Sequence, residues 1–493
     1  MSTPILKNYV NGAFVDAGCR GLLDVENPST GAVIAQVPLS TPEEVDRVVR
    51  TASAAFPGWA ATPVARRVKP LFELAERMRR DEEGLCRVLV EEMGKSLPDA
   101  RAEMKRAIEN LEVACGMPML QQGERLVGCS FEMDGEVLRL PVGVFGMIAP
   151  YNFPAMVPFW FLPYAIATGN TFVVKASEQV PNTMQRIFEH LDAVGLPPGV
   201  VSLVHGDRVA AEALVEHPGV AGISFVGSTK VARQVAARCA ATGKRFQALG
   251  SAKNHLVVMP DARMDEVVRN MISSCFGCAG QRCMASSAIV AVGDATYRDT
   301  IDRFVAASRD VVVADPLDPR VADEQMLMGP VISARHKDFV LKMIDEGVRE
   351  GATLALDGRG LTIPGRPGGH FIGPTVLTDV RPGMAVHLTE IFGPVVVILK
   401  AGSFEEAVGI LNDHPYGNGA SLYTQSGYWA RRFKMEARAG MLGINVGIPA
   451  PVAYLPFGGT KASAFTDIKA QGREVVSFFT ESRIVTERFW PEA

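Results

Sequence analysis

The chain has 493 residues, of which 47% are apolar and 21% charged, and its formal net charge is -4. These values are ordinary for a globular protein and leave no basic surplus for binding nucleic acid or an anionic membrane. The length accommodates about two to four domains with sizeable cores. Eight cysteines spread over the chain are too sparse for a disulfide scaffold, which indicates free thiols in a reducing compartment.

The start of the chain, MSTPILKNYVNGAFV, lacks the basic segment, apolar run and cleavage site of a secretory signal. We therefore expect a cytoplasmic location, or the mitochondrial matrix for a processed eukaryotic chain. Residues 140–174 contain no Asp, Glu, Lys, Arg or His and are long enough to span a bilayer. Five prolines interrupt this stretch, so we expect buried strands and a buried helix instead.

Local patterns predict the first elements. Thr41 can cap a helix that begins at Pro42, and Glu44 can bond back to the cap. From there to about residue 116 the chain is mostly helical in character. Residues 121–140 show strand-like alternation around Asp134-Gly135, a dipeptide that favours a tight hairpin turn.

Between residues 142 and 258, short apolar runs without polar alternation are separated by helical segments. Such runs are typical of strands that are buried on both faces, so they predict a doubly wound parallel sheet of the nucleotide-binding type. The runs are VGVFGMIAP, TFVVKAS, VVSLVHG, GISFVGS, RFQALG and HLVVMP. A second α/β domain is predicted from about residue 271 to 443, with the runs SSAIVAV, PVVVILK, GASLYT and GMLGINV.

A candidate nucleophile ends the segment FGCAGQRC, where Cys283 follows a glycine-rich turn and Arg282. A neighbouring guanidinium stabilises a thiolate, which is the reactive form of cysteine. Taken alone, such a cysteine is more often a buried core thiol. Cys275, Cys278 and Cys283 also resemble metal ligands in spacing, but zinc or an iron–sulfur cluster needs a fourth ligand, so no metal site is predicted.

The cofactor signals are unusual, because no G-x-G-x-x-G fingerprint follows a predicted strand. Gly227-Ser228 ends one strand and opens a helix whose N-terminus can face a pyrophosphate, although alone it reads as a turn. Lys175 and Glu178 follow the strand TFVV at the carboxyl edge of the sheet, where doubly wound domains bind ligands. A carboxylate there suits ribose hydroxyls and repels a 2′-phosphate; the alternative is a solvated loop pair.

The segments APYNFP, VVKASEQ, FVGS, FGCAGQRC and EIFGPV occur in the order and spacing seen in the aldehyde dehydrogenase superfamily. The chain most resembles its methylmalonate-semialdehyde dehydrogenases, which acylate coenzyme A, in SAKNHLVVMPDA, AGQRCMASS, APYNFPAMVPFW and ATGNTFVVKASE. Tyr151 and Ala176 depart from the Phe and Pro of many members, and YLPFGGTKAS looks more like general aldehyde dehydrogenases. The resemblance implies NAD-dependent oxidation of methylmalonate semialdehyde, malonate semialdehyde or both, through a thioester on the cysteine.

The resemblance also implies roles for individual residues. Cys283 matches the nucleophile, and Asn152 matches the side-chain donor to the oxyanion. Arg106 and Arg282 match two arginines that bind the semialdehyde carboxylate, although Arg106 without the resemblance is an ordinary helix residue. The positions that match NAD contacts are Ala149, Tyr151, Lys175, Glu178, Gln179, Ser228, Gly250 and Glu390, the last of which matches the residue that holds the nicotinamide ribose.

One departure bears on the second half of the reaction. The superfamily's usual Glu-Leu-Gly-Gly-Lys, whose glutamate activates the deacylating water, is replaced by residues 249–253, LGSAK. Without a positioned base a thioester hydrolyses slowly, whereas coenzyme A brings its own nucleophile. This favours formation of propionyl-CoA or acetyl-CoA with release of CO2. The alternatives are a hydrolytic enzyme with an unidentified base and a non-catalytic nucleotide-binding protein, against which Cys283, Asn152 and Glu390 argue.

By the same resemblance, the fold class is expected to be α/β, with two doubly wound domains and a small β extension. Residues 1–120 and 141–249 are expected to form the NAD-binding domain, 250–443 the catalytic domain, and 121–140 with 467–493 the extension. Such extensions build dimers and tetramers, so we expect a homotetramer assembled as a dimer of dimers. The expected small-molecule partners are NAD, a semialdehyde and coenzyme A, with no nucleic acid and no membrane.

Overall fold

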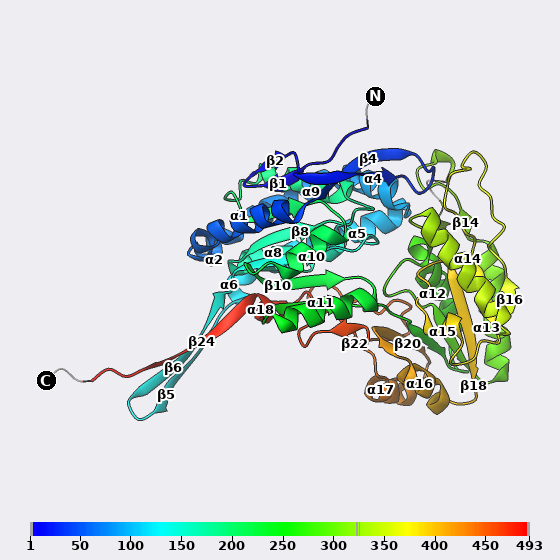
Figure 1. Cartoon of the computed structure of the whole chain (residues 1–493). Coiled ribbons are helices and arrows are strands. Elements are labelled where there is room, and N and C mark those ends of the chain that lie inside the picture. The colour runs from blue at the N-terminus through cyan, green and yellow to red at the C-terminus, as the bar shows by residue number, and fades with distance from the viewer. Residues whose placement is uncertain (1–2, 322–323, 325, 491–493) are drawn as a thin grey trace.

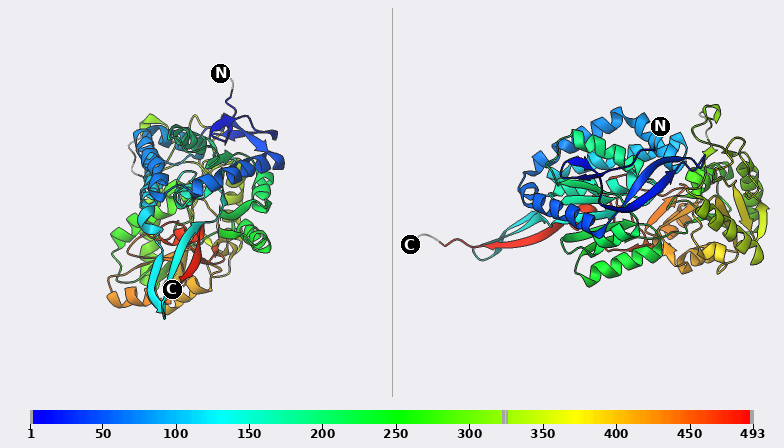
Figure 2. Two further views of the ribbon diagram at one scale, coloured as in Figure 1. Left: turned by 90° about the vertical axis from the view of Figure 1, so that its left-hand side faces the viewer. Right: turned by 45° about the horizontal axis from the view of Figure 1, so that its top comes forward.

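The computed structural model describes residues 3–321, 324 and 326–490. The body consists of two α/β lobes that lie side by side, here called the first and second layers, and a narrow arm projects from it (Figures 1 and 2). The arm is a three-stranded sheet. Residues 140–174 form strands and short helices, as expected, and none of the helices described is long and apolar enough to cross a membrane.

The first layer is an eight-stranded sheet with the order β2-β1-β9-β8-β7-β10-β11-β23. The five strands from β9 to β11 run parallel, and the outer strands on both sides pair antiparallel. The strands are β1 (Asn8–Val10), β2 (Ala13–Val15), β7 (Val144–Ile148), β8 (Thr171–Lys175), β9 (Val201–Val204), β10 (Val220–Val226), β11 (Arg245–Leu249) and β23 (Ala464–Phe465).

Helices cover both faces of this sheet, which explains why its strands lack polar alternation. Phe145 and Met147 of β7 point into one core, whereas Val144 and Ile148 point into the opposite one. The first core is covered by α3 (Lys69–Arg80), α4 (Glu82–Met93), α5 (Leu97–Cys115), α8 (Leu162–Thr168) and α9 (Asn182–Ala193), and the second by α1 (Pro42–Ala60), α10 (Arg208–Glu216) and α11 (Thr229–Ala241).

The second layer is a seven-stranded sheet with the order β16-β17-β18-β13-β12-β20-β21, parallel except at β16. Its strands are β12 (His255–Val258), β13 (Ala288–Val292), β16 (Thr353–Leu356), β17 (Thr375–Thr378), β18 (Val395–Ala401), β20 (Gly419–Tyr423) and β21 (Met441–Ile444). Its helices are α12 (Met264–Phe276), α13 (Asp294–Arg309), α14 (Ala334–Arg349), α16 (Phe404–Asp413) and α17 (Gly427–Glu436).

The prediction for the run HLVVMP was wrong. The sequence pattern grouped this run with the strands of the first sheet. It forms β12, which pairs with β13 and β20 in the second sheet. A run that is buried on both faces looks the same in either sheet, so its pattern carries no information about its partners.

The arm consists of β5 (Glu124–Ser130), β6 (Met133–Pro141) and β24 (Thr480–Glu487), all antiparallel. The hairpin turn lies at Phe131 and Glu132, not at Asp134-Gly135 as predicted. Glu132 adopts a φ of 57°, and the Asp134 carboxylate accepts a hydrogen bond of 2.9 Å from the Gly128 N–H. The Asp-Gly pair therefore braces an irregularity in β5 instead of turning the chain.

The C-terminal segment is divided between the body and the arm. In the segment 467–490, only β24 joins the arm, whereas α18 (Glu474–Phe479) packs against α8 in the body. Residues 491–493 of the expected extension lie outside the described residues. The functional division of the chain into cofactor, catalytic and oligomerisation units stays a prediction.

The cap of α1 is formed only in part. The Thr41 hydroxyl accepts a hydrogen bond from the Glu44 N–H at 3.2 Å, as predicted. The Glu44 carboxylate, however, does not return to Thr41, because it accepts hydrogen bonds from Asn8 at 3.0 Å and Arg47 at 2.6 Å.

Short elements complete the chain. They are β3 (Cys19–Glu26), β4 (Val33–Ser40), β14 (Val312–Val313), β15 (Leu327–Met328), β19 (Tyr416–Gly417), β22 (Thr460–Lys461), α2 (Val64–Arg67), α6 (Met117–Leu120), α7 (Met156–Phe159), α15 (Ala385–Leu388) and the 3-10 turns Gly277–Gly280 and Pro319–Val321.

Candidate active site

Cys283 follows a sharp turn at the end of α12. Within the 3-10 turn, Cys278 and Ala279 adopt φ values of 52° and 53°, and Gly280 adopts 71°. A Cβ on Gly280 would lie 2.2 Å from the carbonyl oxygen of Gly393, so only glycine fits there. This tight turn brings the cysteine into contact with the first-layer core, in a partly exposed position.

Two asparagines fix the backbone of the cysteine. The Nδ2 atoms of Asn254 and Asn418 donate to the carbonyl oxygen of Cys283 at 2.8 Å and 3.0 Å. Asn254 directly precedes β12 and Asn418 directly precedes β20, so two strands of the second sheet position the cysteine. Neither asparagine is predicted from the sequence, because single asparagines next to strands carry no distinctive pattern.

A cavity of about 300 Å³ opens beside Cys283. One wall is a face of α5, where residues at positions 99, 103 and 106 follow the helical repeat. Another wall is aromatic. The lining includes the aromatic side chains of Trp160 and Phe457 and the charged side chains of Asp99, Glu103, Arg106 and Arg282.

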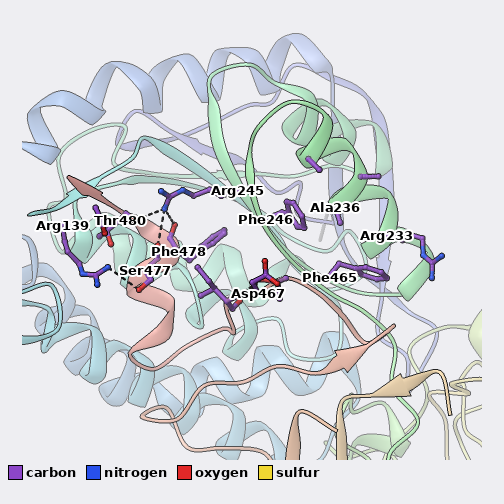
Figure 3. Close-up of a pocket in the computed structure, with 15 residues that line it drawn as sticks. Arg139, Arg233, Ala236, Arg245, Phe246, Phe465, Asp467, Ser477, Phe478 and Thr480 are labelled. Atoms are coloured by element: carbon purple, nitrogen blue, oxygen red, sulfur yellow. Dashed lines mark hydrogen bonds between the residues drawn. The ribbon is translucent and has the colours of Figure 1, made fainter. Parts of the chain in front are cut away.

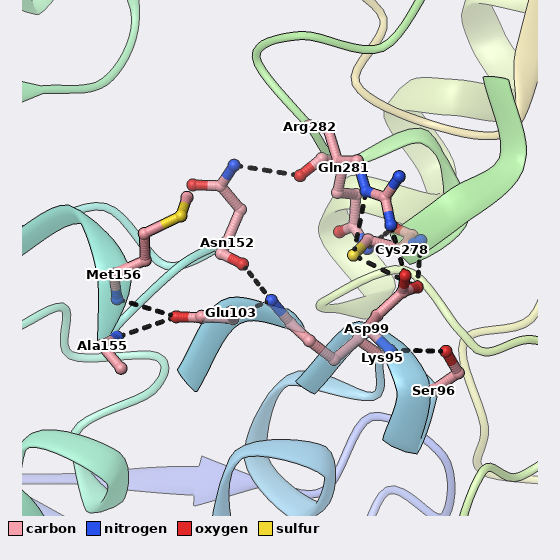
Figure 4. A network of polar contacts seen from close by, with 10 residues as sticks. All are labelled: Lys95, Ser96, Asp99, Glu103, Asn152, Ala155, Met156, Cys278, Gln281 and Arg282. Atoms are coloured by element: carbon pink, nitrogen blue, oxygen red, sulfur yellow. Dashed lines mark hydrogen bonds and ion pairs between the residues drawn. The ribbon is translucent and has the colours of Figure 1, made fainter. Parts of the chain in front are cut away.

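Asn152 lies in the loop that joins β7 to α7, and its side chain is 5% exposed. Its Nδ2 donates to the carbonyl oxygen of Gln281 at 3.0 Å, two residues before the cysteine (Figure 4). Its own carbonyl oxygen accepts a hydrogen bond of 2.7 Å from the Nζ of Lys95. The structure therefore brings the predicted donor next to the loop that carries the predicted nucleophile.

Burial controls the protonation of the reacting centre. It raises the pKa of the Cys283 thiol to about 12, and the nearby carboxylate of Glu390 adds to the rise. Burial also raises the pKa of Glu390 to about 7, although Glu390 accepts a hydrogen bond of 2.9 Å from the Ala252 N–H. At neutral pH these pKa values leave the Cys283 thiol protonated and the Glu390 carboxyl group about half ionised.

Six of the eight predicted cofactor positions line one cleft of about 630 Å³. The cleft lies where β7, β8 and β10 end and α11 begins, which is the ligand-binding edge of a doubly wound sheet. Lys175 Nζ and Glu178 Oε2 form an ion pair of 2.7 Å there, with Glu178 one-third exposed. The six residues are Ala149, Tyr151, Lys175, Glu178, Gln179 and Ser228.

The other two predicted cofactor positions lie outside the lining of that cleft. Gly250 follows β11, and its N–H donates to the carbonyl oxygen of Ser463 at 2.8 Å. A Cβ on Gly250 would lie 2.6 Å from the Thr229 hydroxyl, so the glycine allows α11 to approach β11 closely. The Glu390 carboxylate accepts a hydrogen bond of 2.9 Å from the N–H of Ala252, two residues after Gly250.

The cleft has the features that a dinucleotide requires. The first turn of α11 presents backbone N–H groups, and the Ser228 side chain makes no cap hydrogen bond of its own. The Glu178 carboxylate can accept hydrogen bonds from ribose hydroxyls. The residues present therefore fit NAD.

Both predicted carboxylate-binding arginines line the cavity beside Cys283, and both have acidic partners. The Arg282 guanidinium forms an ion pair with Asp99, and its Nε donates to the Cys278 sulfur at 3.3 Å. Arg106 forms an ion pair with Glu109 one turn along α5 and remains 40% exposed. A substrate carboxylate would have to compete with these partners.

The position of the missing glutamate is occupied by a buried leucine. Leu249 ends β11, is 4% exposed and packs in the first-layer core against which Cys283 also packs. No water-activating group can come from this side chain.

A larger cavity of about 860 Å³ lies at the root of the arm and shares no lining residue with the other two (Figure 3). In it, Arg245 Nη1 donates to the carbonyl oxygens of Phe478 and Thr480, both at 2.7 Å. This arginine therefore fixes the junction at which the chain leaves α18 and enters β24.

The cysteines and carboxylates of the described residues form no group of three or more that could hold a metal ion. Cys275 Sγ donates to the Ser286 carbonyl oxygen at 2.9 Å, and Cys278 contacts Asp99 and Arg282.

The chain is similar to known proteins over nearly its whole length. The model of the aldehyde dehydrogenase family matches residues 14–485. Malonate-semialdehyde dehydrogenase 1 of Geobacillus kaustophilus is 43% identical over 487 residues, which cover 99% of this chain and 98% of the relative. The crystal structure of a methylmalonate-semialdehyde dehydrogenase from Oceanimonas doudoroffii is 39% identical, with a TM-score of 0.96, and covers 100% of this chain and 99% of its own.

A crystal structure described as a putative methylmalonate-semialdehyde dehydrogenase from Sinorhizobium meliloti, complexed with NAD, is 37% identical with a TM-score of 0.97, and covers 100% of this chain and 99% of its own. The agreement extends over both layers, the arm and the loop of Cys283. With the family match over nearly its whole length, the chain belongs to the aldehyde dehydrogenase family.

Proposed function

We propose that this chain is an NAD-dependent, coenzyme A-acylating dehydrogenase of malonate semialdehyde, methylmalonate semialdehyde or both. The observation that carries the acylating assignment is the buried Leu249, which stands where a hydrolytic member has its base. Arginines beside Cys283 and the names of the relatives support a substrate that carries a carboxylate.

NAD would be held in the cleft at the end of β8, with Glu178 on a ribose and the first turn of α11 at Ser228 on the pyrophosphate. Glu390 would hold the nicotinamide ribose. Ala149, Tyr151, Lys175, Gln179 and Gly250 would shape the same path. NAD supplies the acceptor for the hydride.

In the proposed first half-reaction, the Cys283 thiol loses its proton and its sulfur adds to the aldehyde carbon. The second N–H of the Asn152 amide and a backbone N–H hold the resulting oxyanion. When the hydride leaves that carbon, the oxyanion collapses to a carbonyl and a thioester remains on Cys283. The poised carboxylate of Glu390 is a suitable acceptor for the thiol proton.

In the proposed second half-reaction, the thioester carbonyl accepts the electron pair that the departing CO2 leaves behind. Protonation of the resulting enolate gives a propionyl or acetyl group. The thiolate of coenzyme A then attacks the carbonyl and expels the Cys283 thiolate, which regenerates the enzyme. No activated water is needed.

Arg106 and Arg282 would bind the substrate carboxylate on entry. Arg106 would exchange its present acidic partner, Glu109, for the substrate. A guanidinium can hold two carboxylates at its two edges, so Arg282 can keep Asp99 while one edge turns to the substrate.

The alternative is a hydrolytic aldehyde dehydrogenase, and one observation favours it. Glu390 has a pKa raised to about 7 by burial and lies near Cys283, so it could activate a water molecule in place of the absent glutamate. Such an enzyme would release free acid without coenzyme A.

We also propose that the chain forms a homotetramer through its arm. The strands of the arm and its hairpin turn expose large apolar side chains to solvent in the single chain, which is unfavourable unless another copy covers them. These side chains are Leu126, Val127, Phe131, Leu138 and Ile484.

We propose a cytoplasmic location because the cysteines are free thiols. All eight cysteines are free in the structure, and two of them, Cys19 and Cys129, are exposed. Exposed thiols persist in a reducing compartment.

The thioester is tested by intact-protein mass spectrometry. The enzyme is mixed with NAD and methylmalonate semialdehyde without coenzyme A, and we expect an acyl adduct on Cys283 that disappears when coenzyme A is added. The variant Cys283→Ala should form no adduct and no NADH. Turnover by Cys283→Ala would exclude the covalent mechanism.

A further inference from the structure

Two buried charges lie between the helices that flank the active site. Lys95 and Glu103 form an ion pair, and the side chains of both are 0% exposed (Figure 4). Lys95 sits in the short link from α4 to α5, and Glu103 in the second turn of α5. Removing two charges from water is costly, so such a pair persists only where hydrogen bonds satisfy both groups.

The remaining hydrogen bonds of the pair all go to the loop of Asn152. Lys95 Nζ donates to the Asn152 carbonyl oxygen at 2.7 Å and lies 4.0 Å above the Phe153 ring. Glu103 Oε1 accepts hydrogen bonds from the N–H groups of Ala155 at 2.9 Å and Met156 at 3.1 Å. One ion pair thus holds both ends of the segment 152–156.

The same helix holds the opposite loop. Asp99, one turn before Glu103, accepts a hydrogen bond of 3.0 Å from the Cys278 N–H and pairs with Arg282. The Asn152 amide in turn donates to Gln281 at 3.0 Å. The first two turns of α5 therefore contact both sides of the reacting centre and set the distance between them.

We propose that Lys95 and Glu103 are positioning residues that hold the Asn152 amide in register with Cys283. The inference rests on the oxyanion role proposed above for Asn152. Neither residue needs to touch the substrate. Lys95 fixes the carbonyl of Asn152, and Glu103 fixes the next turn, so the amide enters the reaction already oriented, which is the condition for strong oxyanion stabilisation.

The alternative is that the pair only stabilises the fold. A comparison of stability with rate separates the two. Glu92 of α4 offers a matched control, because it is also 0% exposed and also accepts two backbone N–H bonds, from Asn182 at 2.7 Å and Thr183 at 2.8 Å. Those bonds hold the start of α9 and not the Asn152 loop.

The experiment is a double-mutant cycle on the first turnover, followed as NADH formation by stopped flow. Asn152→Ala should slow this step by about 100- to 1,000-fold, the range for loss of an oxyanion donor. Lys95→Met and Glu103→Gln should each slow it by at least about tenfold, with the Kd of NAD unchanged. Adding Asn152→Ala to either variant should cost less than in the native protein, since both act through one amide.

In the control, Glu92→Gln combined with Asn152→Ala should show effects that multiply. If Lys95→Met does not fold, the double variant Lys95→Met/Glu103→Leu removes both charges at similar volume and replaces it in the cycle. Multiplying effects for Lys95 and Glu103, or a normal first turnover in their variants, would overturn this inference alone. A normal first turnover in Asn152→Ala would instead contradict the oxyanion role itself.

Discussion

At the scale of single residues, the candidate active site combines a thiol and a carboxyl group that burial keeps from ionising. Burial raises the pKa of both Cys283 and Glu390, and the negative charge of Glu390 raises the pKa of Cys283 further. A thiol that stays protonated reacts slowly with oxidants and alkylating agents, because the thiolate is the reactive form.

Alkylation of Cys283 tests this protonation state. In the enzyme without NAD, we expect its reaction with iodoacetamide to keep rising with pH beyond about 8.5, the usual cysteine pKa, because burial raises the pKa to about 12. Glu390→Gln removes a negative charge and should lower the pKa and speed alkylation at pH 9. Peptide mapping separates Cys283 from exposed Cys129. A plateau in the alkylation rate of Cys283 with a midpoint below about pH 8.5 would contradict the raised pKa.

The two arginines should behave differently when removed. Arg106→Ala should raise the KM for the semialdehyde by about 10- to 100-fold through loss of a charged hydrogen bond, with stability nearly unchanged because the side chain is 40% exposed. Arg282→Ala should also destabilise the fold by about 3 kcal/mol, because it leaves the largely buried Asp99 without its partner.

These differences are measured with thermal unfolding and with kinetics on the semialdehyde and on propanal. Propanal has no carboxylate, so its KM should be the same for Arg106→Ala and the native enzyme. An equal rise in KM for the semialdehyde and for propanal in Arg106→Ala would show that Arg106 does not recognise the carboxylate.

Residue roles could be inferred from the sequence where they lie in short contiguous motifs. Cys283 and Asn152 are predicted from recognisable segments, and the structure places the Asn152 amide next to the loop of Cys283. Six of the predicted cofactor positions line one cleft. Lys95 and Glu103 could not be found that way. Their significance arises from contacts with residues 152–156, which are more than 50 positions away along the chain.

At the scale of elements, the second sheet carries a cluster of three buried histidines. The Nε2 atoms of His255 and His387 lie 2.9 Å apart, and His414 packs against both. Burial lowers the pKa of His387 to about 3 and that of His414 to about 4, and the charges of Lys253 and Lys461 oppose protonation further.

This cluster predicts loss of stability in acid. The unfolded chain takes up protons on these histidines below pH 6.5 while the folded chain does not, so stability is highest above pH 6.5 and falls as the pH decreases. Each histidine should contribute a slope of about 1.4 kcal/mol per pH unit. Urea unfolding between pH 7 and 4.5 should show a shallower slope for His387→Gln. An equal pH dependence of stability in the native protein and in His387→Gln would show that His387 does not contribute to the loss of stability in acid.

Helices and strands could be predicted where their burial produces a recognisable pattern of apolar residues in the sequence. Strands buried on both faces appear as apolar runs, and ten such runs became strands. Pairing was less accessible, because β12 could join either sheet and the hairpin turn depended on how Asp134 bonds to Gly128. Both are decided by tertiary contacts.

At the scale of the whole molecule, the arm should determine assembly. Leu126 and Ile484 are 64% and 72% exposed and, by strand register, lie on one face of the arm. Leu126→Asp/Ile484→Asp should lower the oligomeric state measured by analytical ultracentrifugation, whereas Arg483→Asp on the opposite face should have less effect. A monomeric native protein would exclude the proposed tetramer.

The most direct test of the proposed function is the dependence of the product on coenzyme A. NADH formation is measured with malonate and methylmalonate semialdehydes, with and without coenzyme A, and the products are identified by mass spectrometry. The account predicts multiple turnovers and acetyl-CoA or propionyl-CoA only when coenzyme A is present, with at most a single turnover without it. Sustained release of free acid without coenzyme A would contradict it and would identify a hydrolytic enzyme in which another base replaces the missing glutamate.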